Sequence, residues 1–435
     1  MPKRRVVFWG LVVRWLVLVL AGWLGYALLR GLWAIIYLGA PVYDWLWYLP
    51  VTVLLVGVPV CLALRLFRQR WALILLGGAL ILALVGYNGL GQAVHLRPGR
   101  AAAVPISFWA FSDFRLASPA LLQDLEASGG RIYLHFGDYP VNQERSLALI
   151  ERLRPLDGYK IEVYLGPPAP EFLSTLSYHE WSDSALALAD LAKREGLTHV
   201  RGLIGDVEPP LNKPMDVFGV ERARFDQAVL GLRDLIDEVH HEYPDLRIGV
   251  TATGAHYLDQ LDGDSDLAVA MRSPLDPPGG WDFLNVMTYS SYFPPDWRAY
   301  YVYLVERGTA RLEPNGQVSH LIGLVGGGFP WEPLLDFDDL VRDARLSRAL
   351  GVREIVVFQL DGALQQFGPD FVRRLTSAVN APGPDLVVPF ARPASMLVYG
   401  AAVADALLDV RGPLGWLWIV WAIVCALTAR ARYRA

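Results

Sequence analysis

The middle of this chain alternates short apolar runs with longer segments whose apolar residues recur every three or four positions. The first pattern is typical of buried strands and the second of amphipathic helices. We expect strands at residues 104–111, 131–136, 160–165, 200–206, 247–253, 283–289, 318–325 and 354–360. We expect helices at residues 119–127, 143–153, 184–195, 220–242, 264–271, 295–307, 337–350 and 369–379.

Each expected strand is followed by one expected helix. Eight such repeats in about 280 residues are what a (β/α)8 TIM barrel requires. An open, doubly wound sheet is the alternative, but no Gly-x-Gly-x-x-Gly follows the first strand. The pattern therefore predicts an α/β protein in which residues 95–390 form a (β/α)8 barrel.

Both ends of the chain carry long apolar stretches, at residues 6–29, 45–66, 71–90 and 414–428. Stretches of roughly 20 apolar residues match the hydrocarbon core of a bilayer. We expect transmembrane α-helices to flank the barrel, three within residues 1–94 and one within residues 391–435. A cleaved signal peptide is the alternative for the first stretch. Residues 395–408 are apolar but contain Asp405, and we expect them to form an interfacial or re-entrant helix.

Basic residues mark one side of these spans. Clusters around Arg4, Arg68 and Arg432 fall on the same side if the chain crosses three times, exports its middle and crosses back once. The positive-inside rule then places both termini in the cytoplasm and the barrel outside. Residues 95–393 hold 41 Asp and Glu against 27 Lys and Arg, whereas the flanks hold 3 against 12. So acidic a barrel argues against a nucleic-acid partner, whose phosphates attract basic surfaces.

A carboxylate pair ends the fourth expected strand, where residues 205–209 read Gly-Asp-Val-Glu-Pro. Side chains alternate faces along a strand, so Asp206 and Glu208 point the same way. Two adjacent carboxylates repel, and one of them then retains a proton near neutral pH, as a general acid for glycoside cleavage must. A capping Asp beside a solvated Glu is the plain structural alternative.

Barrel enzymes carry their chemistry at the C-terminal ends of the strands. The residues there, or on the same inward faces, that we expect to bind substrate are Trp109, Asp138, Tyr164, Asn285, Tyr292, Trp331, Gln359 and Asp361. Aromatic side chains among them suit the apolar faces of sugar rings. Two structural alternatives remain. The polar side chains inside the barrel could only hydrogen-bond to one another, and the aromatic side chains could only pack the loops. No residues have metal-ligand spacing, and we expect neither a metal nor a cofactor.

These motifs resemble those of the glycoside hydrolase family 18 chitinases and their relatives over about residues 104–380. Asp206-Val-Glu208 falls where that family ends its Asp-x-x-Asp-x-Asp-x-Glu motif, and Met287-Thr-Tyr289 matches its Met-x-Tyr. The stretch that begins at Leu321 resembles the family's seventh strand. The resemblance implies that Glu208 is acid and base, and that Asp206 and Tyr289 steady the substrate's own N-acetyl group as nucleophile.

The chain also departs from the family pattern. Arg201 and Ile204 stand at the first two motif aspartates, Ser290 replaces the Asp after the Tyr, and Phe358 or Gln359 replaces a strand-eight Trp. Three hypotheses follow. The first is a membrane-anchored hydrolase that acts outside the cytoplasmic membrane on a carbohydrate polymer with N-acetylhexosamine. The second is a two-glutamate retaining hydrolase that uses Glu208 and Glu332. The third is a barrel that binds glycan without cutting it, or that organises envelope proteins through its spans.

Overall fold

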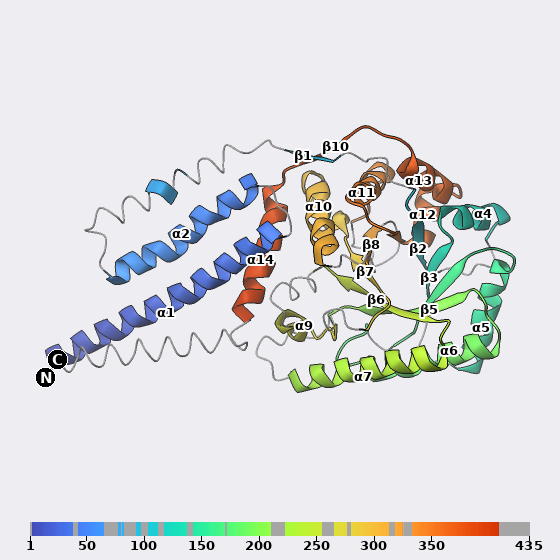
Figure 1. Ribbon diagram of the computed structural model, residues 1–435, viewed down its shortest axis with the longest axis horizontal. Helices are drawn as coiled ribbons and strands as arrows, with labels where there is room; N and C mark the ends of the chain where they lie inside the picture. Colours follow the sequence, from blue (N-terminus) through green and yellow to red (C-terminus); the bar gives the residue numbers. More distant parts are fainter. Residues whose placement is uncertain are drawn as a thin grey trace. The chain divides into compact units, whose positions relative to one another are not determined.

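The computed structural model of the chain divides into two compact units (Figure 1). One unit comprises residues 1–93 and 390–435, and the other residues 94–389. The structure describes residues 2–37, 42–64, 77–79, 81, 93–96, 103–111, 117–136, 142–169, 172–209, 222–254, 265–275, 280–312, 318–323, 325 and 333–408.

The second unit is a closed barrel of eight parallel strands, in the order β2-β3-β4-β5-β6-β7-β8-β9. The strands are β2 (Ile106–Ala110), β3 (Arg131–His135), β4 (Glu162–Gly166), β5 (Val200–Val207), β6 (Arg247–Thr253), β7 (Phe283–Met287), β8 (Val318–Gly323) and β9 (Ile355–Phe358). The expected (β/α)8 barrel is therefore confirmed, and each strand overlaps its expected range.

Helices surround this barrel (Figure 1). They are α4 (Pro119–Ser128), α5 (Gln143–Leu153), α6 (Tyr178–Arg194), α7 (Arg222–Glu242), α9 (Asp266–Ala270), α10 (Pro295–Leu312), α11 (Phe337–Leu350), α12 (Leu360–Phe367) and α13 (Phe371–Asn380). Side-chain caps begin several of them, as at α11, where Asp336 accepts a hydrogen bond from the backbone of Asp339. Outside the barrel wall, β1 (Ala93–Leu96) pairs with β10 (Leu386–Pro389) in a two-stranded sheet.

The end of the eighth strand differs from the expectation. We expected a strand through residue 360, but β9 ends at Phe358 and α12 begins at Leu360. Buried Leu360 and Ala363 and partly buried Phe367 are three and four residues apart. That spacing is the period of a helix, so this apolar face packs better as a helical turn than as an extended strand.

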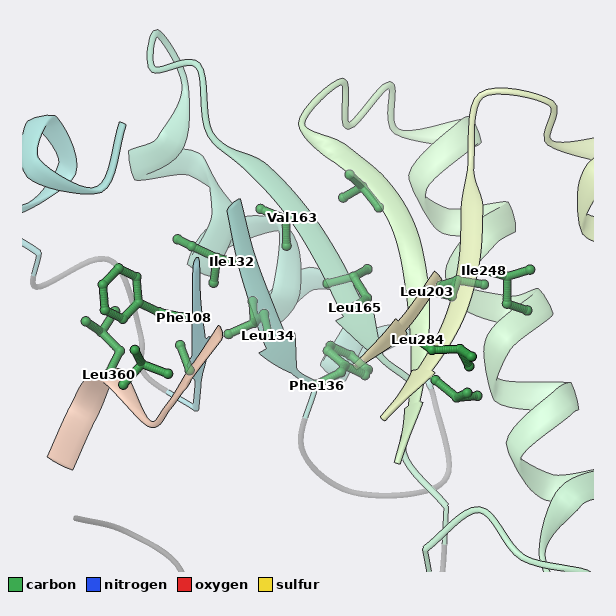
Figure 2. Close-up of a cluster of buried hydrophobic side chains, with 14 of the residues drawn as sticks. Phe108, Ile132, Leu134, Phe136, Val163, Leu165, Leu203, Ile248, Leu284 and Leu360 are labelled. Carbon is green, nitrogen blue, oxygen red and sulfur yellow. The ribbon is translucent and has the colours of Figure 1, made fainter. Parts of the chain in front are cut away.

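The two faces of each strand enter different environments. Outward side chains such as Phe108, Ile132 and Leu203 form the core between strands and helices, which Figure 2 shows in part. Inward side chains form a second cluster of mostly aromatic and aliphatic residues: Trp109, Tyr133, Tyr164, Ile204, Phe283, Met287, Leu321 and Val356. The expected alternation of faces is thus confirmed.

Two glycines make room for the inward rings. A Cβ at Gly202 on β5 would lie 2.8 Å from the ring of Tyr164, and one at Gly249 on β6 would lie 2.6 Å from the ring of Phe283. Because real side-chain contacts do not come this close, both positions need glycine for the aromatic layer to pack.

The first unit contains the helices α1 (Pro2–Tyr37), α2 (Val42–Leu64) and α14 (Arg392–Leu408). Tyr399 on α14 stacks on Tyr48 of α2, with ring centroids 4.3 Å apart, and a Cβ at Gly31 of α1 would lie 2.6 Å from Val403. The expected interfacial segment, residues 395–408, is therefore part of a helix packed against α1 and α2.

Among the described residues, Val13–Ile36 is the one helix long and apolar enough to cross a membrane. It is 24 residues long and lies near the N-terminus, where a signal sequence would also meet these criteria. Tyr48–Val60 is a shorter apolar helical segment. Of the other expected spans, most of residues 71–90 and all of residues 414–428 lie outside the described residues.

Candidate active site

The carboxylate pair lies at the C-terminal end of β5. Asp206 is the neighbour of Thr251 on β6, and Ile204, two residues earlier, belongs to the inward cluster. Alternation therefore directs Asp206 into the barrel and Glu208, just past the strand, to the same side at its mouth. Both residues are half-buried. This is the end of the barrel where enzymes of this fold carry their catalytic groups.

Asp206 is enclosed beside a second carboxyl group. Its Oδ1 is fully enclosed and has no hydrogen-bond partner among the described residues. Burial and the neighbouring Glu208 carboxylate raise the pKa of Asp206 well above its usual range. A charge on one of these two carboxyl groups therefore disfavours a charge on the other.

Aromatic rings cover the neighbouring strand ends. The ring centroid of Tyr289, which follows β7, lies 5.8 Å from that of Phe358 and 6.4 Å from that of Tyr292. Phe358 in turn lies 6.3 Å from Trp109 and 6.0 Å from Phe111. Tyr292 and Phe111 remain 46% and 42% exposed, so the layer has faces open to a ligand. Rings exposed in this way can stack on sugar faces.

The residues on both sides of Tyr289 are fixed from outside the barrel. Thr288 Oγ1 lies 3.2 Å from Nδ1 of His320 on β8, and Ser290 donates a hydrogen bond to Asp343 on α11. Thr288 and Ser290 are both fully buried. Where the family that the motifs resemble has an aspartate in the chain, this protein therefore has a serine bonded to an aspartate of α11.

The structure places the other expected site residues in different surroundings. Trp109 and Asn285 are buried in the barrel interior, as is Tyr164, over whose ring the guanidinium of Arg131 lies at 5.0 Å. Gln359 is the residue before α12, and Asp361 accepts a hydrogen bond of 2.8 Å from the backbone of Phe111. These two do not share a strand face as expected, because the strand ends before them.

Three expected residues, Asp138, Trp331 and Glu332, lie outside the described residues. The sequence analysis also missed three residues that border the site: Phe111, His320 and Asp343. Phe111 has a detectable signal, since it is the last residue of the first expected strand and thus lies at the barrel mouth. His320 and Asp343 have none, because polar and charged residues are mostly exposed and nothing in the local sequence marks these two as buried.

The opposite end of the barrel is closed by ion pairs. Arg131 on β3 bonds Glu354 at 2.7 Å and Glu162 at 3.3 Å, and Tyr133 donates to Glu354 at 3.3 Å. A cavity of about 270 Å³ opens beside these groups and is lined by Arg131, Glu354 and Ser319 among others. Paired charges at the N-terminal face of a barrel serve stability rather than chemistry. In the described part of the chain, no three His, Cys, Asp or Glu side chains cluster as a metal site.

The fold and these residues define a (β/α)8 barrel with a carboxylate pair and an aromatic layer at its C-terminal end. No protein-family model matches the chain, and no curated protein does. Solved structures similar to it include the PgaB (BpsB) glycoside hydrolase domain from Bordetella bronchiseptica, at 13% identity and a TM-score of 0.40, covering 65% of this chain and 100% of that one. A family 18 chitinase from Pseudoalteromonas aurantia has 15% identity and a TM-score of 0.41, covering 63% and 99%. A family 18 chitinase from Cycas revoluta, solved with allosamidin, has 13% identity and a TM-score of 0.40, covering 63% and 99%.

Proposed function

We propose that this protein is a glycosidase that cleaves an N-acetylhexosamine-containing glycan, with Glu208 as its general acid and base. The observation that carries the proposal is the inward-facing pair of Asp206 and Glu208 at the C-terminal end of β5, where burial and mutual repulsion raise the pKa of Asp206. A pair that shares a proton at a barrel mouth supplies both an acid and a negative charge.

Each residue of the pair has a separate role in this proposal. Glu208 donates its proton to the glycosidic oxygen as the bond from that oxygen to the anomeric carbon breaks. The carbonyl oxygen of the substrate's own N-acetyl group forms the new bond to the carbon, and the Asp206 carboxylate stabilises the positive charge that develops on the acetamido nitrogen. Glu208, now a carboxylate, takes a proton from the water that opens this intermediate, so the anomeric configuration is retained.

The aromatic layer supports a sugar substrate. Tyr289 follows β7 and ends the Met-x-Tyr motif. Its hydroxyl would hold the acetyl oxygen as that oxygen closes on the anomeric carbon. Exposed faces of Tyr292 and Phe111 would stack on sugar rings beside the bond that is cleaved. Glycan chains present such apolar faces in succession, which suits a layer that extends across several strand ends.

We place the barrel outside the cytoplasmic membrane, anchored by spans in residues 1–94 and 391–435. The apolar helix Val13–Ile36 and the clusters around Arg4, Arg68 and Arg432 support this arrangement. Reporter fusions after Arg70 and after Ala435 should be active in the cytoplasm, and one after Arg97 should be active outside. A reporter after Ala435 that is active outside would contradict the count of four spans.

The proposal is tested with the full chain, purified in detergent and incubated with envelope glycans and chitin oligosaccharides. We expect mass spectrometry to detect shortened products. Glu208→Gln keeps the shape and removes the transferable proton, so turnover should fall by roughly 10²–10⁴-fold. Glu238→Gln, at an exposed position of α7, is the matched control and should leave turnover unchanged.

Glu332→Gln separates the two hydrolase mechanisms. The variant should keep nearly wild-type turnover if the substrate supplies the nucleophile. It should lose turnover if Glu332 is the nucleophile of a two-glutamate enzyme. A glycan that the chain binds but never cleaves, or wild-type turnover in Glu208→Gln, would contradict both mechanisms and leave a binding barrel.

A further inference from the structure

A row of polar residues crosses the inside of the barrel beneath the carboxylate pair. Asp206 on β5 is the register partner of Thr251 on β6, Thr251 of Asn285 on β7, and Asn285 of Ser319 on β8. Asp206 lies near the end of its strand and Ser319 near the start of its own. The row therefore descends through the interior, from the C-terminal mouth to the cavity at the N-terminal end, which Ser319 lines.

Three neighbours in this row carry polar atoms without a partner. Asp206 Oδ1, Thr251 Oγ1 and Asn285 Nδ2 are buried, and none has a hydrogen bond to any described residue. Thr251 is 1% exposed and Asn285 is 0% exposed. Buried polar atoms in native proteins are almost always hydrogen-bonded, to protein or to ordered water. Because these three belong to adjacent strands and do not bond one another directly, bridging water is the partner that fits.

The hydrogen bonds along this row of residues can all run in one direction, from donor to acceptor. Ser319 donates a hydrogen bond from its hydroxyl to Oδ1 of Asn285. The side-chain nitrogen of Asn285, Nδ2, is then the atom left to donate to another group. Thr251 lies next in the row and can pass a hydrogen bond on through its hydroxyl. Each group therefore presents a donor to the one above it, and the last acceptor in the row is Asp206.

The neighbouring inward residue on β5 itself offers Asp206 no hydrogen-bond donor. Ile204, the inward residue below it, is buried among aromatic side chains at the position where the family that the motifs resemble has another aspartate. Glu208, just past the end of β5, is the titratable group that acts on Asp206, and it disfavours a charge on Asp206.

We propose that Thr251 and Asn285 are positioning residues which, through ordered water inside the barrel, hold the Asp206 side chain in place and favour its carboxylate form. What the charge of Asp206 then does in catalysis rests on the proposed function. The row itself is a property of the folded barrel and can be tested without turnover.

The test is a titration of the full chain in detergent, labelled with ¹³C at the aspartate side-chain carboxyl carbons. The Asp206 signal is assigned as the one lost in Asp206→Asn. We expect Thr251→Val and Asn285→Leu each to raise the pKa of Asp206 by about one unit or more, since each removes hydrogen bonding to a charged group. Thr251→Ser restores the hydroxyl and should restore the wild-type pKa.

The matched control is Thr376→Val. Thr376 on α13 also has a buried hydroxyl without a partner among the described residues, but it lies outside the barrel wall. If the pKa of Asp206 is the same in Thr251→Val, Asn285→Leu and Thr376→Val, the proposal is wrong. If a variant does not fold, a crystal structure of the wild type decides: ordered water that joins Thr251 and Asn285 to Asp206 supports the proposal, and direct bonds or a dry interior overturn it. A shifted pKa in a protein that cleaves no glycan would refute the proposed function alone.

Discussion

At the scale of single residues, Tyr289 is held more firmly than its half-exposed position suggests. Its two neighbours in the chain are fully buried and bonded to His320 and Asp343. The backbone of Tyr289 therefore has little freedom, and its hydroxyl can meet a substrate at low entropic cost.

Tyr289→Phe tests this position. It removes one hydrogen bond and keeps the ring, so we expect kcat to fall roughly 10-fold with little change in KM, because the bond strengthens mainly in the transition state. Tyr159→Phe, which precedes β4 on the opposite side of the barrel from the C-terminal strand ends, serves as the control. An equal loss in both variants, or a loss confined to KM, would contradict the role given to Tyr289.

Asp206 and Glu208 could be predicted from sequence, since the two-residue period of a strand fixes which side chains share a face. The support around them could not. Thr251 and Asn285 become neighbours of Asp206 only through the register of three strands, and register is set by the closure of the whole barrel rather than by local pattern.

At the scale of secondary structure, the outward face of β8 carries an unusual buried histidine. His320 lies among Thr288, Thr309 and the fully buried Glu306 of α10. Burial lowers the pKa of His320 to about 3, so the ring is neutral in the folded protein. Burial also raises the pKa of Glu306, which keeps a second charge out of this site.

This histidine predicts a pH dependence of stability. An unfolded chain binds a proton at His320 below about pH 6.5, whereas the folded protein does not until about pH 3. The contribution of His320 to the free energy of unfolding should therefore fall by about 1.4 kcal/mol per pH unit as pH drops through this range. His320→Gln should lose this part of the slope in urea titrations followed by tryptophan fluorescence. His241→Gln, at an exposed position on α7, should keep it. Equal slopes in all three proteins would show that His320 is charged when folded.

The helix α12 could not be predicted from sequence. Its first turn follows a strand without an intervening turn signal, and four apolar residues at 355–358 run directly into Leu360. Short apolar runs fit strand and helix equally well, so the boundary depends on where Leu360 and Ala363 find packing partners. The longer helices, with clear three- and four-residue periods, could be placed from sequence alone.

At the scale of the whole molecule, the barrel has its own core. The residues of the main hydrophobic cluster run from Val104 to Val379, all within the second unit. We therefore expect residues 95–390, expressed without their flanks, to unfold in a single cooperative transition in urea. A version that begins at residue 103 would show what residues 95–102, with the second half of β1, contribute. Aggregated or non-cooperative material from both fragments would contradict an independent barrel.

The packing of α1, α2 and α14 could not be predicted from sequence. Helices that are apolar on most sides carry no stripe that indicates a neighbour, and the contacts at Gly31 and Tyr48 depend on the close approach of segments more than 300 residues apart. The length and apolar composition of Val13–Ile36 would fit a membrane span, but they do not indicate which helices meet.

The pairing of β1 with β10 also bears on how such a chain could have arisen. The polypeptide enters and leaves the barrel through two strands that are hydrogen-bonded to each other, so nearly 300 residues begin and end at one place. A domain with adjacent ends can be inserted into a host chain without separating the segments on either side. The barrel could therefore be exchanged as a unit for a different domain with adjacent ends, inserted between the same two points of the flanking chain.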